Sequence, residues 1–245
     1  MRRLLSAGLV AVLALALLAG AIALIGAYTF LPSIMEAAVA RDVRDDLGLT
    51  ETPDVRLESD PQPAMLTGEF SDGLVRIRDA RLGGVRAASV TVDLEAFDVD
   101  ISRSVSRSEF VGDGPLSGRL RVTVVEQEIA RLASENADVP VSSIELERGR
   151  MVALSSVQVL GIEVPVSVAG SLDLRDGSLV FEPESLEAAG VPVPGELSDQ
   201  LLSGTGFAYP LEGLPDGVTL TGAEVEEGRL VFTGGVKDIP LGTPG

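Results

Sequence analysis

Apolar and polar residues alternate along most of the chain beyond residue 66. Successive side chains of a β-strand point to opposite faces, so this alternation predicts strands with one apolar face and one solvated face. Strands of a parallel sheet are buried on both faces and give unbroken apolar runs, so the pattern favours an antiparallel sheet. Asp-Gly pairs, which favour tight hairpin turns, separate several of the runs. The clearest alternating runs lie at residues 75–78, 89–94, 119–124 and 162–174.

Three segments show a helical period instead. The first spans residues 33–47, between the N-capping Ser33 and Gly48, and its apolar positions form one stripe that we expect to pack on the sheet. The other two helices are predicted at residues 126–136 and 195–202, where leucines and isoleucines fall on one face. The stripe of the first helix consists of Met35, Val39, Val43 and Leu47.

No charged side chain occurs from residue 4 to residue 31. As a helix, this run is longer than the ~30 Å hydrocarbon core of a bilayer. Arg2 and Arg3 precede it and all acidic residues follow it, so the positive-inside rule predicts a single-pass anchor with its N-terminus in the cytoplasm. Cleavage as a signal peptide after Ala21 or Ala23 is the alternative, and it gives a secreted protein. We expect a transmembrane anchor at residues 1–31 and an exported domain at residues 32–245, at the cytoplasmic membrane.

The predicted sheet has more apolar face than the predicted helices can cover. The helices at 33–47 and 126–136 make roughly seven turns, against about nine or ten expected strands. The sheet must then close on itself as a sandwich or barrel, curl around a helix, or leave a groove for an apolar ligand. If a groove is present, the side chains that we expect to line it are Val90, Val92, Leu94, Val164, Val166, Val168, Leu172 and Leu174.

Charge and composition exclude several kinds of partner and site. The chain has 37 acidic and 19 basic residues, a net charge of −18, and all its acids follow the uncharged run. Nucleic acid is therefore excluded as a partner, because phosphate binding needs a basic surface, and so is a polybasic patch on anionic lipid. The chain has no His, no Cys and no Trp. Ser-His-Asp and Cys-His catalysis, zinc sites built on His or Cys, and disulfides are absent as a result.

The remaining enzymatic possibility is a pair of carboxylates, as in glycoside hydrolysis. The acids, however, lie at turns and at alternate strand positions, where a solvated face needs them. A cluster at Asp93, Glu95, Asp98 and Asp100 lacks the spacing of a calcium-binding loop. We therefore expect no catalytic residues, no metal site and no cofactor.

Three sequence segments resemble one family. Leu31-Pro32 opens the first predicted helix, and Leu116-Ser-Gly-Arg-Leu-Arg-Val-Thr-Val leads into the helix at 126–136. The segment Leu214-Pro-Asp-Gly-Val-Thr-Leu-Thr-Gly-Ala-Glu-Val is followed by Gly228-Arg-Leu-Val-Phe-Thr-Gly. Together these segments are similar to the LmeA-like family of envelope phospholipid-binding proteins, over nearly all of the chain after residue 31.

The resemblance implies an α+β fold akin to the tubular lipid-binding domains. Its mostly antiparallel, curved β-sheet would wrap against a long N-terminal helix and one central helix, after the N-terminal transmembrane anchor. It also implies a non-catalytic protein that binds membrane phospholipid at the outer face of the cytoplasmic membrane and supports maturation or transport of envelope lipid or lipoglycan. The alternative is a structural or scaffolding envelope domain with a closed β core and an acidic face that binds envelope proteins.

Overall fold

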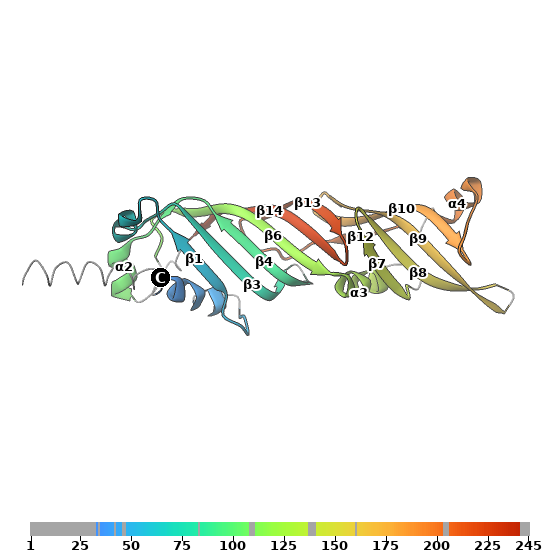
Figure 1. The fold of residues 1–245 in the computed structure, drawn as a ribbon, viewed down its shortest axis with the longest axis horizontal. Helices are drawn as coiled ribbons and strands as arrows, with labels where there is room; N and C mark the ends of the chain where they lie inside the picture. The colour runs from blue at the N-terminus through green and yellow to red at the C-terminus, as the bar shows by residue number, and fades with distance from the viewer. Residues whose placement is uncertain are drawn as a thin grey trace, which may run out of the picture. The chain divides into compact units, whose positions relative to one another are not determined.

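The computed structural model describes residues 33, 35–41, 43–45, 48–82, 84–107, 111–136, 141–159, 161–202 and 206–240 (Figure 1). These residues form two compact units. The first holds the described residues up to Gly73 together with Ala96–Gly114, and the second holds Leu74–Glu95 and Pro115–Ile239. The expected division into residues 1–31 and 32–245 stays a prediction, because residues 1–32 lie outside the described part of the chain.

The second unit contains two antiparallel sheets, as the alternating pattern predicts. All strand pairs with a recorded register in these sheets are antiparallel. In the first sheet the neighbours are, in order, β3 (Asp72–Leu82), β4 (Val85–Leu94), β6 (Pro115–Val125), β14 (Arg229–Pro240) and β13 (Val218–Glu226). In the second they are β11 (Val191–Pro192), β10 (Ser178–Ala188), β9 (Ile162–Arg175), β8 (Arg150–Val159) and β7 (Ser143–Glu147), and β12 (Phe207–Pro210) also pairs with β10.

Close approach between strands bends both sheets. A Cβ atom at Gly170 would lie 2.1 Å from the carbonyl oxygen of Glu182, and one at Gly234 would lie 2.1 Å from that of Thr219. The registers of β9 with β10 and of β13 with β14 shift close to these glycines. Glycines and bulges of this kind let a strand bend without losing its partner.

A helix, α3 (Glu126–Asn136), joins the two sheets and has the bounds predicted from the sequence. Its apolar face, Ile129, Leu132 and Ala133, is buried. Two carboxylates in its first turn accept backbone N–H groups from opposite sides. Glu126 Oε2 lies 2.7 Å from the nitrogen of Leu146 in β7, and Glu128 Oε1 lies 2.9 Å from that of Arg86 in β4. The helix therefore bonds to the main chain of both sheets.

The turns of two hairpins reinforce this junction. The N–H of Gly149, between β7 and β8, donates to the carbonyl of Val225 in β13 at 2.9 Å. In return, the N–H of Gly228, between β13 and β14, donates to the carbonyl of Leu146 at 2.9 Å. Hydrogen bonds of this kind satisfy main-chain groups that a sheet leaves unpaired at its hairpin ends. The two sheets of the second unit thus share a hydrogen-bonded boundary.

The first unit consists of short elements. Phe70 and Phe97 stack with their ring centroids 5.1 Å apart where β2 pairs with β5. Its elements are β1 (Asp54–Glu58), η1 (Gln62–Thr67), β2 (Glu69–Phe70), β5 (Phe97–Asp98) and α2 (Ile101–Arg107), together with helical residues at 33, 35–41 and 43–45. Met35 and Val39 of the predicted stripe are buried, and Leu47 lies outside the described residues.

No long N-terminal helix is found among the described residues, so this part of the expected fold is wrong, although residues 33, 35–41 and 43–45 are helical within the predicted helix at 33–47. Its helical residues stop before Gly48, whose φ of +60° is left-handed. The N–H of Leu49 then turns back to the carbonyl of Arg44 at 2.8 Å, a bond that closes a helix end. The longest unbroken helix described is α3, with 11 residues. None of the described helices has the length and apolarity to cross a bilayer, and the uncharged run at 4–31 lies outside them.

Candidate functional site

The eight residues predicted to line a groove lie on two strands in different sheets. Three of them, Val90, Val92 and Leu94, belong to β4 in the first sheet. The other five, Val164, Val166, Val168, Leu172 and Leu174, belong to β9 in the second sheet. The structure therefore does not bring the eight together in one groove, and each set has its own surroundings.

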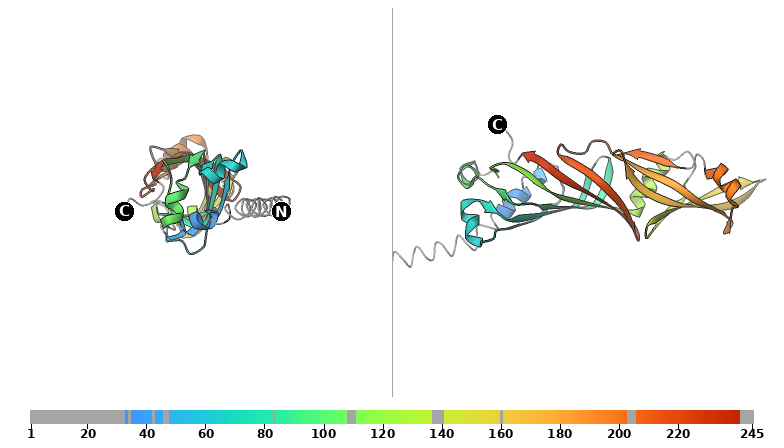
Figure 2. Two further views of the ribbon diagram at one scale, coloured as in Figure 1. Left: turned by 90° about the vertical axis from the view of Figure 1, so that its left-hand side faces the viewer. Right: turned by 90° about the horizontal axis from the view of Figure 1, so that it is seen from above.

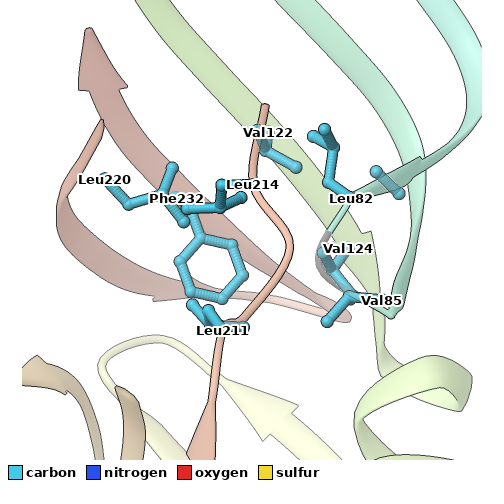
Figure 3. A pocket seen from close by; sticks show the side chains of 9 residues that line it. Leu82, Val85, Val122, Val124, Leu211, Leu214, Leu220 and Phe232 are labelled. Carbon is cyan, nitrogen blue, oxygen red and sulfur yellow. The ribbon is translucent and has the colours of Figure 1, made fainter. Parts of the chain in front are cut away.

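Strand β4 helps to line a narrow apolar crevice, but through Val85 and Ala87 rather than through the three predicted residues. Val90 is buried and pairs with Val122 of β6, while Val92 and Leu94 are half-buried. Figure 3 shows the side chains of Leu211, Leu214 and Phe232 facing those of Val122 and Val124. The residues that line the crevice are Leu82, Val85, Ala87, Val122, Val124, Leu211, Leu214, Leu220 and Phe232.

The crevice is closed to a large ligand. The room inside it is about 10 Å³ for the centres of water-sized spheres, which is no more than one water molecule needs. An acyl chain enters this space only if the segment at 211–214 moves away. As it stands, the inner face of the first sheet is a packed core, which is one of the outcomes left open by the sequence.

The β9 set forms part of the apolar face of the second sheet, and the inner half of that face is covered. Leu172 is buried and pairs with Phe181 of β10, whose ring stacks on that of Phe207 in β12 with centroids 5.8 Å apart. Helix α3 contacts β7 and β12 there. Leu174 is half-buried and pairs with the fully buried Leu179. This half of the face is therefore core.

The outer half of the same face is open. Its members Val164, Val166 and Val168 are only half-buried. Towards the start of β9, exposure rises to 68% at Ile162, and Val157, which pairs with Val164, is 39% exposed. We call these five residues the open face: Val157, Ile162, Val164, Val166 and Val168. The alternate residues of β9 on the other side of the sheet are polar, as at Glu163 and Ser167.

A short helix, α4 (Gly195–Leu202), borders the open face and has the predicted bounds. It contacts β10, and its Ser198 and Leu202 are buried. Leu197 and Leu201 point outward, 57% and 58% exposed. These two leucines and Ile162 are not among the site residues predicted from the sequence. The helical period put all three leucines of α4 in one segment but could not show which of them the sheet would cover.

The first unit has a hollow of about 680 Å³ with different chemistry. Its lining includes the carboxylates of Asp60, Glu69, Asp98 and Asp113 and no basic side chain. Charged carboxylates disfavour the burial of an acyl chain. Within the described residues, no set of three or more acidic side chains is arranged to hold a metal ion.

The predicted acidic cluster is divided in the structure. Asp93 and Glu95 belong to the second unit, and Asp98 and Asp100 to the first. Asp100 accepts the N–H of Arg103 at 2.9 Å and pairs with its guanidinium at 3.3 Å. These contacts are those of a carboxylate at the start of a helix, here α2.

Helix α3 carries an ion pair whose carboxylate, that of Glu128, is buried. Glu128 of α3 is buried, and its carboxylate accepts from Arg131 Nε at 3.0 Å as well as from the N–H of Arg86. The hydrogen bond from Arg131 lowers the pKa of the Glu128 carboxyl, against the opposing effect of burial. Arg131 also reaches Glu135 at 2.6 Å, and its own pKa is raised by the two carboxylates, Glu128 first. This network holds α3 in place against β4, and the Glu128 and Arg131 side chains are both occupied by these contacts.

Comparison with known proteins gave one match. A sequence model of a protein family, described as LmeA-like phospholipid-binding, matches residues 26–235, which is most of the chain. No curated protein and no solved structure matches the chain.

Proposed function

Because the chain belongs to the LmeA-like phospholipid-binding family, we propose that it holds the acyl chains of a phospholipid against the open face of the second sheet, without catalysis. The observation that supports this site is the row of half-buried aliphatic side chains on β9, which continues outward into the exposed Ile162. The crevice in the first sheet is too narrow for the same role.

The open face suits an acyl chain in chemistry and in length. Its side chains are all valine or isoleucine, and each methylene group that they remove from water contributes roughly 0.8 kcal/mol. From Ile162 to Val168 the strand rises about 20 Å, whereas an acyl chain spans about 15 Å in one leaflet of a bilayer. A single chain can therefore lie along this row.

The proposed location is the outer face of the cytoplasmic membrane. The uncharged run at 4–31, preceded by Arg2 and Arg3, supports a single-pass anchor with the domain outside, and signal cleavage would instead release the domain. At either place the protein would support maturation or transport of envelope lipid or lipoglycan. Holding and moving a lipid needs only an apolar surface, so the role is compatible with a chain that has no His or Cys.

Photo-crosslinking of the full chain tests this site. The chain is incorporated into phosphatidylethanolamine vesicles in which one acyl chain carries a diazirine, and the labelled peptides are mapped after irradiation. We expect labels within residues 151–168, because a bound acyl chain lies on β8 and β9. Labels confined to residues 1–32 would show ordinary membrane contact and would refute the proposed site, in favour of a closed, scaffolding domain.

A further inference from the structure

Exposed aliphatic side chains occur on three elements at the outer end of the second sheet. They come from three elements: Ile162 from the start of β9, Val191 from β11, and Leu197 and Leu201 from α4. Each is more than half exposed, at 57% to 68%. We call these four residues the apolar tip. Figure 2 shows α4 and the β8–β9 hairpin at the same end of this sheet.

The strand registers show that the tip is continuous with the open face. Val191 pairs with Ala188 of β10, and Ala188 pairs with Val166 of β9. Directly opposite residues of antiparallel strands share a face, so Val191 and Val166 lie on the same side of the sheet. Ile162 lies four residues from Val166 along β9, an even spacing that also keeps it on this side. A ligand leaving the open face along β9 therefore reaches the tip first.

The charges around the tip exclude an electrostatic mode of attachment. No Lys or Arg occurs at residues 151–174 or 176–228, and the neighbouring charged residues Glu163, Glu187 and Glu196 are acidic and exposed. Basic side chains are what attracts a protein to anionic headgroups. The tip also lacks the Tyr, Trp, Arg and Met side chains that are enriched at the centres of protein interfaces. Its chemistry is that of aliphatic side chains that insert between acyl chains.

We propose that the apolar tip inserts into a phospholipid bilayer, so that the lipid passes between the membrane and the open face without crossing water. This inference rests on the proposed function, because it concerns how the ligand reaches the same face. The lipid that the site holds resides in a bilayer, and the tip joins that site to its source. Insertion driven by aliphatic side chains alone does not require anionic lipid and is insensitive to salt.

A single introduced cysteine reports on this insertion, because the natural chain has none. The full chain carries Leu197→Cys or Ile162→Cys, is labelled with an environment-sensitive fluorophore, and is mixed with phosphatidylcholine vesicles that contain doxyl-labelled phosphatidylcholine. We expect a blue shift of the fluorophore's emission, and quenching by the doxyl groups, at both positions. The result should be the same whether the doxyl-labelled lipid is in the vesicles that carry the protein or in vesicles added to them. The matched control is Glu145→Cys, an exposed residue on the solvated side of β7, which stays unquenched.

A transfer assay gives an independent measurement. Leu197→Ser with Leu201→Ser should slow the movement of fluorescent phosphatidylcholine between vesicles by about tenfold or more, since the two substitutions remove apolar side chains from the inserted surface. Glu196→Ser, on the same helix, keeps the natural rate.

Three outcomes separate the possibilities. Absence of quenching at Leu197 and Ile162, with diazirine labels still found within 151–168, would refute tip insertion and leave the proposed function standing. Absence of both the quenching and the diazirine labels would refute tip insertion and the proposed function together. A blue shift that needs no vesicles and rises with protein concentration would show that a second copy covers the tip, and this too would refute insertion.

Discussion

We expect that replacing Val166 with aspartate abolishes phospholipid binding while the protein remains folded. Val166 is half-buried at the centre of the open face, so in the lipid-free protein the new carboxylate can stay hydrated. Against an acyl chain it would lose that water, and an uncompensated charge in apolar surroundings costs several kcal/mol. We expect the yield of diazirine crosslinks within residues 151–168 to fall by about a hundredfold or more.

The matched control for this substitution is Ser167→Asp. Ser167 is the next residue of β9 and points to the polar side of the sheet. The same charge introduced there leaves the crosslinking yield unchanged. Circular dichroism and thermal unfolding of both variants establish that the fold is retained. If Val166→Asp does unfold the protein, Val166→Thr, which keeps the shape and adds one hydroxyl, should still lower the yield about threefold. If Val166→Asp and Val166→Thr both gave the same crosslinking yield as the natural protein, the lipid would lie elsewhere.

Replacing Glu128 with glutamine destabilises the second unit by about 2 kcal/mol. The buried carboxylate accepts both the N–H of Arg86 in β4 and the guanidinium of Arg131. A glutamine keeps one acceptor oxygen but directs an amide NH₂ group at the arginine. Urea unfolding curves give the free energy of unfolding. The matched control is Glu135→Gln, which removes the other carboxylate on Arg131 but is exposed, so the free energy of unfolding changes by less than about 0.5 kcal/mol.

The lowered pKa of Glu128 predicts how the free energy of unfolding depends on pH. The pKa of Glu128 is lower in the folded protein, chiefly through its hydrogen bond from Arg131. A lowered carboxyl pKa contributes stability above the ordinary value of about 4.3 and loses it as the pH falls through the folded value. The difference in free energy of unfolding between the natural protein and Glu128→Gln should therefore be constant near neutral pH and shrink in acid. A difference that grows in acid would contradict this assignment.

Local patterns in the sequence predicted much of the fold. Helices α3 and α4 have the predicted bounds because each begins where strand alternation stops and a helical period begins. The run at 162–174 is one strand, β9, as its strict alternation requires. Strand β1 and helix η1 were not predicted, because three prolines lie between residues 51 and 63. The signal for β1 was present, since Val55 and Leu57 alternate with polar neighbours and are buried.

Two properties of the candidate site could not be predicted from local pattern. A strand's alternation shows which side is apolar but not what covers it, so the covered Leu172 and the open Val166 look alike in sequence. The pairing of distant strands is equally hidden. Val90 pairs with Val122, which lines a crevice together with Leu211 and Leu214, and nothing near Val90 in the sequence indicates a segment so far along the chain. For this reason the eight predicted residues do not form one groove: three belong to the first sheet, two to the covered half of the second sheet and three to its open face.

The strand order of the first sheet also constrains the order in which the two sheets can fold. Strand β14 lies inside this sheet, between β6 and the edge strand β13, and follows all the other described strands in the sequence, whereas β7 to β12 form the second sheet from one continuous stretch. The second sheet can therefore assemble while the chain is still emerging, but β6 waits for a partner about a hundred residues away, and such distant pairings form slowly. A premature stop near residue 228 would leave two unpaired edges in the middle of a sheet, and exposed edges promote aggregation.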